Sequence, residues 1–445
     1  MKARFIIAEY NPLHKGHVEQ LKIARHRLQE DEALVILMSG DFCQRGIPAI
    51  LDKYQRASSA IKLGADLVLK LPSYYSCSHA GNFAKGAISI IAGTNICSEI
   101  ICGSESANYE LLSEFATIIN DESPYFKLSL KSELELGLSF ADARARALID
   151  TLKETKLDLY LKYGKDYILD FLKQSNDILA LAYLSELKKH NMHDKIFFHK
   201  RVGKLNEKDS SLMNNEIDET SKAFATISEE LLPASALREL LSSNRKPSQI
   251  MMNLSSYLPP VITASLCMAT KNSKLLFSSD LSLLLHQSLN MMDKEAISKL
   301  PEFSEGLLDR ILNTYQELNL DNYYDTFEAL VDMVASKRYP KTRVRRALLH
   351  LILGADNFIL DDIDLKYTRI LAYNRKGRYL LKEMRKASDI CLISNSAAAL
   401  KSLDNEQLKY FKLDLKAEML CDILRGNKKN SLFSKYPIEI KIKHK

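Results

Sequence analysis

Short apolar runs alternate with helical patterns over the first hundred residues of the chain. The apolar runs predict strands at residues 5–8, 33–38, 66–71 and 99–102, and the segments between them predict helices at residues 17–29, 51–63 and 79–91. Strand, helix and strand at this spacing are typical of parallel βαβ units, so the pattern predicts an α/β fold with a Rossmann-like doubly wound parallel sheet. Ligands of such sheets bind at the carboxyl ends of the strands, where polar residues stand here at 9–14, 39–45 and 103–105.

The rest of the chain is mostly helical in pattern. Helical spacing runs from residue 108 to about 187, a β-prone run at 195–199 predicts one more strand, and the polar stretch at 203–220 is expected to be an exposed loop. Helical patterns return at 233–241 and from 255 to 353, and the last part contains a helix at 376–386 and a strand at 390–393. We therefore divide the chain into an α/β domain with a helical insertion (1–250), a helical domain (251–360) and a small mixed region with a basic tail (361–445).

Composition restricts the class of protein. The chain has 445 residues, 46% of them hydrophobic and 27% charged, which is typical of a globular protein of two or three domains. No apolar stretch approaches the ~20 residues of a membrane span, and Glu9 interrupts the apolar run that follows Arg4, so we expect a cytoplasmic protein without a secretory signal. The seven cysteines are scattered and include no C-x-x-C pair, so we expect neither a disulfide framework nor a metal site.

Positive charge is concentrated in two places. The net charge is +6, but residues 425–445 alone carry seven Lys or Arg against one acid, and residues 337–346 carry six with no acid. Concentrated basic charge is what binding to a polyanion requires, since each neutralised phosphate releases counterions. A solvated helix face and a disordered tail are the alternatives, and for the tail we favour the second.

The sharpest chemical feature is the sequence AEYNPLHKGH at residues 8–17, which follows the first predicted strand and opens the first helix. A helix N-terminus offers free N–H groups and a partial positive charge, both suited to phosphate. Gly16 lets the backbone approach closely where a Cβ would obstruct it. His14 and His17 can each donate to a phosphate oxygen as charge builds up on it. Four residues alone are a weak signal, but their location between the N-terminal strand and the first helix makes the pattern specific for a phosphate site.

The placement of His14-Lys15-Gly16-His17 resembles the HxGH motif of the nucleotidylyltransferase superfamily, whose members cleave ATP between the α and β phosphates. Across most of its length the chain resembles one family more closely, the bacterial tRNA(Met) cytidine acetate ligases. The segments that carry this resemblance are EYNP (9–12), MSGDFCQRG (38–46), PA (48–49), DLV (66–68), LP (71–72), FA (83–84), GSE (103–105), Asn176 with Ile178 and Leu179, KR (200–201), Ser235-Ala236 with Arg238, and residues 338–346 and 374–381.

The resemblance implies an enzyme that activates acetate with ATP, forming acetyl adenylate and pyrophosphate, and then transfers the acetyl group to N4 of the wobble cytidine of elongator tRNA(Met). The product is N4-acetylcytidine. Domain 1–250 would then bind ATP and domain 251–360 would bind tRNA. Mg²⁺ is expected to accompany ATP, without a fixed protein site.

The resemblance also implies roles for individual residues. His14 and His17 would be catalytic and would stabilise the α-phosphate, while Arg201 and Arg238 would neutralise the leaving pyrophosphate. The implied ATP site consists of Ile7, Ala8, Glu9, Tyr10, Asn11, Pro12, Leu13, His14, Lys15, Gly16, His17, Val18, Glu19, Gln20, Gly103, Asn176, Arg201, Ser235 and Arg238. The candidates for tRNA binding are Arg338, Lys341, Arg343, Arg345 and Arg346, with a solvent-facing structural helix as the alternative.

Departures from the family pattern and other classes of function stay open at this point. Lys70 stands where the family usually has an acid, Gly81 stands where it usually has Glu, and residues 203–206 replace an expected Gly-x-x-Tyr-His-Asp segment. One alternative is a nucleotidylyltransferase that acts on a small phosphorylated acceptor, and another is a non-catalytic RNA-binding relative.

Aromatic pairs and isolated histidines outside the motif are interpreted as structural. Half-buried packing is expected for Tyr74, Tyr75, Tyr323 and Tyr324. Satisfied structural roles are expected for His26, His79, His286 and His350.

Overall fold

The computed structural model describes residues 1–201, 232–243, 246–318, 323–354, 364–427 and 436–441. Within these ranges the centre of the protein is an eight-stranded sheet of order β5-β4-β1-β2-β3-β6-β7, with β8 also paired to β6. The strands are β1 (Lys2–Ala8), β2 (Glu32–Ser39), β3 (Leu67–Leu71), β4 (Cys97–Ser104), β5 (Ile196–Lys200), β6 (Tyr367–Tyr373), β7 (Cys391–Ile393) and β8 (Ile438–Glu439). The first five strands pair in parallel, whereas β6 runs antiparallel to β3. The predicted α/β class with a mostly parallel sheet is confirmed.

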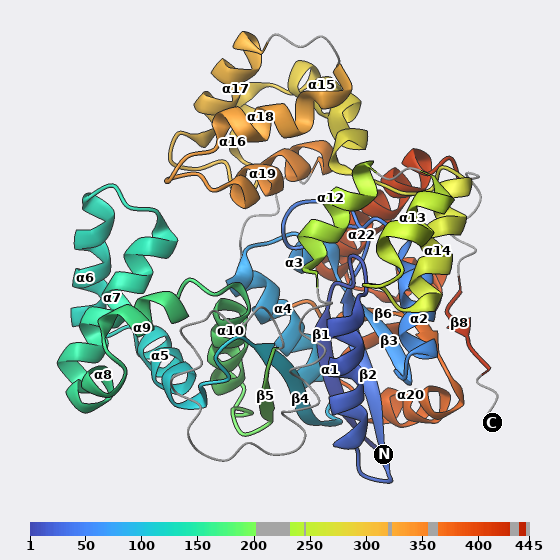
Figure 1. Ribbon diagram of the computed structural model, residues 1–445, viewed down its shortest axis with the longest axis horizontal. Helices are drawn as coiled ribbons and strands as arrows, with labels where there is room; N and C mark the ends of the chain where they lie inside the picture. The colour runs from blue at the N-terminus through green and yellow to red at the C-terminus, as the bar shows by residue number, and fades with distance from the viewer. Residues whose placement is uncertain (202–231, 244–245, 319–322, 355–363, 428–435, 442–445) are drawn as a thin grey trace.

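Helices cover both faces of this sheet (Figure 1). The helices that lie against it include α1 (Lys15–His26), α2 (Lys53–Lys62), α4 (Ala80–Gly93) and α10 (Ser175–Lys189). Phe5 and Val35 pack with α4 and α10, whereas their neighbours Ile6 and Ile36 pack with α1 and α2. All eight residues of β2 are buried as a result. A strand covered on both faces appears in the sequence as an unbroken apolar run, which is why the pattern revealed it.

Two groups of helices stand out from the sheet in Figure 1. The insertion comprises α5 (Tyr109–Asp121), α6 (Pro124–Glu135), α7 (Phe140–Thr155), α8 (Leu157–Tyr163) and α9 (Lys165–Phe171). The second group, which we call the helical lobe, comprises η3 (Ser278–Leu281), α15 (Ser282–Met291), α16 (Lys294–Ser298), α17 (Leu307–Glu317), η4 (Tyr323–Asp325), α18 (Thr326–Val334) and α19 (Lys341–Leu353). Helices α12 (Ala234–Ser243), α13 (Pro247–Leu254) and α14 (Pro260–Lys271) instead share a core cluster with α1 and α2.

The C-terminal part adds strands to the same sheet. Strand β6, which the pattern did not predict, pairs with β3, and β7 and β8 pair with β6. The accompanying helices are α20 (Arg375–Ala387), α21 (Ser396–Ser402) and α22 (Asn405–Leu424). The boundary predicted at residue 361 therefore separates pieces that share one sheet, and the division into domains stays a prediction.

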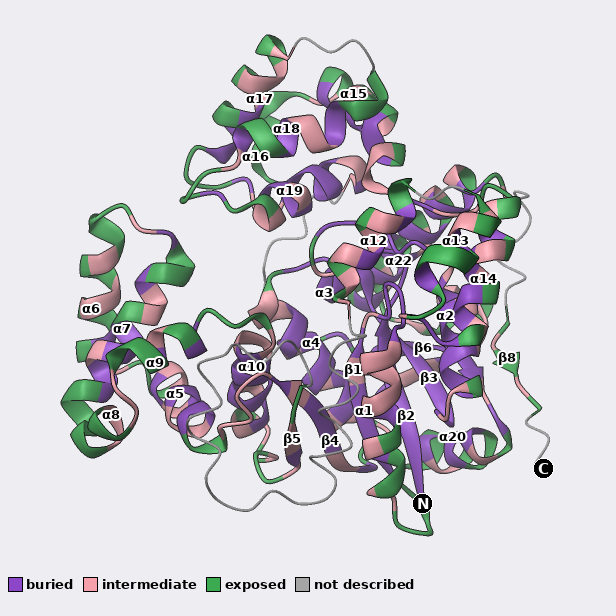
Figure 2. Ribbon diagram, viewed as in Figure 1, coloured by how far each residue is buried: buried purple, intermediate pink, exposed green. Residues whose placement is uncertain are grey.

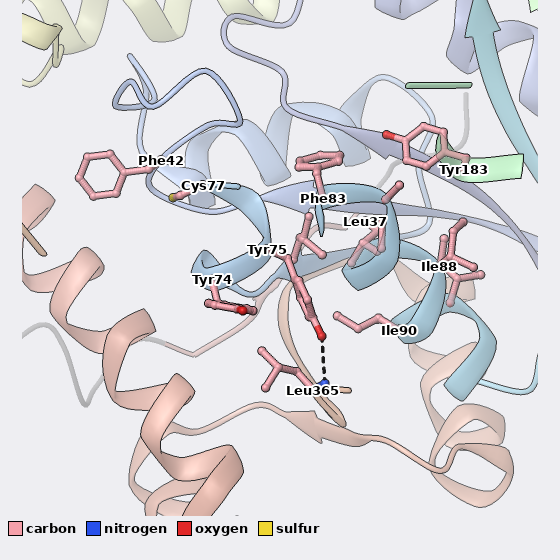
Figure 3. Packing of buried hydrophobic residues seen from close by; sticks show 14 of the residues in the cluster. Leu37, Phe42, Tyr74, Tyr75, Cys77, Phe83, Ile88, Ile90, Tyr183 and Leu365 are labelled. Carbon is pink, nitrogen blue, oxygen red and sulfur yellow. Dashed lines mark hydrogen bonds between the residues drawn. The ribbon is translucent and has the colours of Figure 1, made fainter. Parts of the chain in front are cut away.

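The aromatic pairs behave differently from one another. Tyr74 and Tyr75 are fully buried around the short helix α3 (Ser73–Ser76), and the Tyr75 hydroxyl accepts a hydrogen bond from the Leu365 N–H at 3.2 Å (Figure 3). Tyr323 and Tyr324 are 67% and 58% exposed, so the expectation of half-buried packing is wrong for this second pair.

Lys70, one of the departures from the family pattern, lies in a buried ion pair. Its Nζ is 2.8 Å from Asp414 Oδ1 on α22, and its side-chain stem occupies the space that a Cβ on Gly40 would need. The same Asp414 accepts hydrogen bonds from the Ser73 N–H and the Tyr367 hydroxyl. A buried cation requires such a partner, and here it comes from 344 positions further along the chain.

Every strand and helix named in the prediction for residues 1–199 and 233–393 is present, with ends shifted by a few residues, and β6 is an additional strand. Burial follows the same layering, with exposed positions on the outer helix faces (Figure 2). The polar stretch at 203–220 lies outside the described residues. No helix in the described ranges is both long and apolar enough to span a membrane.

Candidate active site

Helix α1 begins in the loop that leaves β1, and His14 is its N-cap residue. Nδ1 of His14 accepts a hydrogen bond from the Gly16 N–H (3.1 Å), and Nδ1 of His17 accepts one from the His14 N–H (3.3 Å). The two rings stack with centroids 3.9 Å apart. A Cβ on Gly16 would lie 3.1 Å from Cε1 of His14, so glycine at this position makes room for the His14 ring.

Both imidazoles are neutral donors at neutral pH. Because Nδ1 of each ring accepts an N–H, the neutral form of each ring carries its own proton on Nε2. Burial and the charge of Arg201 lower the pKa of His14 to about 4. Burial, His14 and Arg201 hold the pKa of His17 well below its ordinary value. The N-terminus of α1 therefore presents two Nε2–H groups that add no positive charge of their own.

A buried arginine ties together the loops that follow the first two strands. Arg56 on α2 is fully buried and donates to the carbonyl oxygens of Glu9 (2.6 Å), Ser39 (3.1 Å) and Gly40. These loops contain the EYNP and SGD segments, so one guanidinium fixes two walls of the site. The sequence analysis did not single out Arg56, because nothing in its local pattern distinguishes it from other helical arginines.

The loop before α1 is held by hydrogen bonds to distant parts of the chain. Asn11 accepts a hydrogen bond from the Ile50 N–H through Oδ1 (2.9 Å), and its peptide bond to Pro12 is cis. Nη1 of Arg238 on α12 donates to the Asn11 carbonyl oxygen at 2.8 Å, so this predicted phosphate ligand reaches the motif from a distant part of the chain. Ser235, one turn earlier on α12, is exposed.

Glu9 carries an unusual carboxyl group. Its Oε1 accepts a hydrogen bond from the Gln44 N–H at 2.6 Å. Burial raises the pKa of Glu9, whereas that hydrogen bond and the charges of Arg238, Arg45 and Arg56 oppose the rise. Glu9 thus links the loop after β1 to the loop after β2.

Three further predicted residues meet at the end of β4. Nη1 of Arg201 donates to Oδ1 of Asn176 (2.5 Å), and Nδ2 of Asn176 donates to Oε1 of Glu105 (2.6 Å). A Cβ on Gly103 would lie 3.0 Å from Cγ of Arg201, so glycine lets the arginine lie across the strand end. Because Arg201 also lowers the pKa of His14, this group and the histidines belong to one site. Glu105 was part of the GSE segment but had no assigned role.

The other residues of the implied ATP site lie in or beside α1. The side chains of Tyr10 and Leu13 are buried, which makes them part of the wall. Val18, Glu19 and Gln20 lie half-buried along the helix, and the Lys15 N–H donates to the Tyr257 carbonyl oxygen at 3.3 Å. The remaining members, at the end of β1 and before the helix, are Ile7, Ala8 and Pro12.

The basic segment at residues 337–346 lies in the helical lobe, and most of its charged side chains form ion pairs. Helix α19 begins at Lys341 after Pro340, so Arg338 precedes the helix and does not share a face with the α19 residues. The four candidates on α19 face carboxylates of the same lobe: Lys341 with Asp332 (2.6 Å), Arg343 with Glu305 (3.0 Å), Arg345 with Glu328 (2.7 Å) and Arg346 with Glu302 (2.5 Å). The segment has no acid within it, but the fold supplies acids from elsewhere.

The basic helix also touches the candidate active site. A Cβ on Gly46 would lie 2.5 Å from the backbone nitrogen of Arg346, so the loop after β2 packs directly against α19. Arg345 lies close enough to Arg238 for its charge to lower the pKa of that guanidinium, although burial is the main cause of the lowering. The lobe and the histidine motif are therefore neighbours.

Two of the isolated histidines test the structural interpretation. Both ring nitrogens of His286 are hydrogen-bonded, to the Tyr315 and Thr326 hydroxyls at 2.7 and 2.6 Å, as expected. Nδ1 of His350 is buried without a partner among the described residues, so this histidine is not fully satisfied there. Within the described ranges, no three His, Cys, Asp or Glu side chains are grouped as metal ligands would be.

Comparison with known proteins gives a consistent result. Residues 1–435 match the model of the family described as HIGH Nucleotidyl Transferase. The tRNA(Met) cytidine acetate ligase of Clostridium tetani is 33% identical over 432 residues, which cover 94% of this chain and 98% of that protein. The protein of the same name from Clostridium novyi is 35% identical over 391 residues, covering 86% of this chain and 88% of that protein. The crystal structure of Thermotoga maritima TmcAL bound with alpha-thio ATP superimposes with a TM-score of 0.84 at 26% identity, over 99% of this chain and 100% of that chain.

Proposed function

The chain belongs to the tRNA(Met) cytidine acetate ligases of the HIGH nucleotidyl transferase family, and on this premise we propose that it is an ATP-dependent ligase that joins acetate to tRNA(Met). The observation that carries the proposal is the pair of neutral imidazoles at the N-terminus of α1, with Arg201 and Arg238 beside them. That arrangement suits a triphosphate, because it combines free helix N–H groups, two neutral donors and two cations.

In the first step a carboxylate oxygen of acetate attacks the α-phosphorus of ATP. A new P–O bond forms, the bond from the α-phosphorus to the bridging oxygen breaks, and pyrophosphate leaves. The Nε2–H groups of His14 and His17 donate to the non-bridging α-phosphate oxygens as negative charge develops there. Arg201 and Arg238 balance the charge of the departing pyrophosphate.

In the second step the exocyclic N4 amine of the wobble cytidine attacks the acetyl carbonyl carbon. The amide bond forms, the bond from the carbonyl carbon to the phosphate oxygen breaks, and AMP leaves while N4 loses a proton. An anticodon base is single-stranded and reaches a pocket at modest cost. Contact between α19 and the loop after β2 brings the basic lobe next to the histidine motif, which supports delivery of this base by a tRNA held on the lobe.

Exposed cations of the lobe are the part of the basic segment best suited to tRNA. Arg338 and Lys341 are exposed, whereas Arg346 is buried in its pair with Glu302. We assign Arg346 to the structure of the lobe and keep Arg338, Lys341, Arg343 and Arg345 as contacts with the tRNA backbone. Mg²⁺ enters with ATP, held chiefly by phosphate oxygens, as is usual for this ion.

The decisive experiment is mass spectrometry of nucleosides from a tRNA(Met) transcript incubated with the protein, ATP, Mg²⁺ and isotopically labelled acetate. We expect labelled N4-acetylcytidine at the wobble position only when ATP and acetate are both present. Pyrophosphate release without labelled cytidine would retain the ATP chemistry and reject the acceptor. No pyrophosphate release with acetate would reject the ligase function.

A further inference from the structure

We propose that the helical lobe holds the phosphodiester backbone of an RNA strand in a polar hollow between α17 and the segment before α19. The hollow has a volume of about 650 Å³, and the side chains important here are Arg310, Asn313, Thr314, Glu317, Ser336 and Arg338. The inference rests on the proposed function for the identity of the RNA. It adds a contact surface that the HxGH site does not include and brings in Arg310, which the sequence pattern did not single out.

The hollow is formed by one face of a helix. Arg310, Asn313, Thr314 and Glu317 stand at intervals of three, four and seven, so they share a face of α17. The adjoining face buries Leu307, Leu308 and Ile311 in the lobe core. Packing of the apolar face therefore fixes the direction of the polar face, which borders Ser336 and Arg338.

Charge distinguishes this hollow from α19. The basic side chains of α19 lie within 3.0 Å of carboxylates of the lobe. Among the described residues, neither Arg310 nor Arg338 has a carboxylate at ion-pair distance. Exposed ion pairs already satisfy much of a cation's attraction for anions, so these two guanidiniums keep more of their positive charge available to a polyanion than the paired side chains of α19 do.

Both guanidiniums are held in place without being neutralised. Nε of Arg310 donates to the Val334 carbonyl oxygen at 2.7 Å. The guanidinium of Arg338 lies 5.7 Å from the ring centroid of Tyr339, whose buried ring is fixed by a hydrogen bond from its hydroxyl to the Glu305 carbonyl oxygen. Positioned cations lose less side-chain entropy when they bind.

The lining has the composition of a phosphate-backbone contact. Arg, Ser, Thr and Asn side chains make most hydrogen bonds to phosphate and sugar oxygens in nucleic-acid complexes. The hollow is larger than a single phosphate requires. Arg338 stands three residues before α19, and α19 packs against the loop after β2. A strand held here would therefore run beside the proposed site of acetyl transfer.

The test compares charge removal in the hollow with equal charge removal elsewhere. In the double variant Arg310→Ala with Arg338→Ala, we expect about a ten-fold loss of affinity for a tRNA(Met) transcript at moderate salt. The slope of log affinity against log salt should become shallower by about 1.5, since two phosphate contacts are lost. The control Lys382→Ala with Arg385→Ala removes two exposed cations from α20 and should change neither quantity.

A variant that removes a negative charge from the hollow strengthens the test. Glu317→Gln removes the one acid named in the lining and should tighten RNA binding, which general destabilisation of the lobe would not do. Unchanged RNA affinity in the double variant, with a native unfolding curve, would overturn the proposal. Loss of ATP affinity with unchanged RNA affinity would assign the hollow to a free nucleotide and would also overturn it.

The outcome is separable from that of the proposed function. Pyrophosphate release by the wild-type protein with ATP and acetate, without RNA, measures the ATP chemistry alone. If the wild type binds the transcript but forms no N4-acetylcytidine, the ligase proposal fails, while the comparison of binding between variants still decides the role of the hollow.

Discussion

Replacing His14 by Asn or by Ala separates two tasks that one imidazole performs. Nδ1 of His14 accepts the Gly16 N–H and caps α1, which leaves Nε2–H as the donor in the proposed transfer at phosphorus. Asn is among the best N-cap residues, so His14→Asn keeps an acceptor for the helix, while His14→Ala loses the cap at a cost of about 1 kcal/mol in the free energy of unfolding. Neither variant retains a donor at the position of Nε2.

The expected catalytic loss is the same for both variants. Removing one hydrogen bond to charge that develops in the transition state costs about 10²- to 10³-fold in kcat. The assay is pyrophosphate release with saturating ATP and acetate in the absence of tRNA, accompanied by urea unfolding. We expect His14→Asn to be nearly as stable as wild type and as inactive as His14→Ala.

Specific results would refute this reasoning. Wild-type kcat in His14→Asn would mean that Nε2–H does not act on the phosphate. Equal stability of His14→Ala and wild type would mean that the cap contributes nothing. Because the pKa of His14 is about 4, the wild-type rate should also show no loss from protonation of this ring between pH 8 and 6.

Three further predictions concern α19 and the residues around it. Gly46 has a φ of +72° and no room for a Cβ beside the backbone of Arg346. Gly137 has a similar φ of +79° but open surroundings, so Gly137→Ala should lower the free energy of unfolding by only about 1–2 kcal/mol, and Gly46→Ala should lower it by more. Equal losses in urea unfolding would contradict the packing argument. Arg346→Ala removes the closer of the two cations that pair with Glu302 and leaves Arg343 Nε 3.7 Å from Glu302 Oε2, so it should cost less than the about 3–5 kcal/mol of a buried charge left without any partner, with partial recovery on adding Glu302→Gln. An unchanged free energy of unfolding would show that the pair is not structural. Burial lowers the pKa of His350 to about 4, so the unfolded chain binds this proton below about pH 6.5 and the folded chain does not. The free energy of unfolding should therefore fall as the pH is lowered from 6.5 to 4, by at most about 1.4 kcal/mol per pH unit for this group, and His350→Gln should flatten the fall; an unchanged slope would reject the assignment.

Local pattern was sufficient for much of the fold and for the centre of the site. Each of the buried parallel strands contains a short run of apolar residues, and the helices between them have regular apolar spacing, so each is visible within a short window of sequence. The HxGH motif is equally local, because His14, Gly16 and His17 interact with one another within a single helical turn. Its position after the first strand was therefore enough to predict the site.

Strand β6 and the charge of the lobe could not be predicted in this way. Strand β6 contains Arg369, which is buried and pairs with Glu418 at 2.5 Å, and its local sequence does not show that a carboxylate on α22 meets this charge. In the same way, residues 337–346 show no acid, yet carboxylates from other parts of the lobe pair with the basic side chains of α19.

The sequence by itself determined the α/β class, the order of the first five strands along the chain and the motif that begins α1, because these depend on interactions between residues close together in the chain. The tertiary structure alone decided where the buried charges find partners. Lys70 shows the reason: the free energy of burying its ammonium group depends on Asp414, and only folding brings the two together.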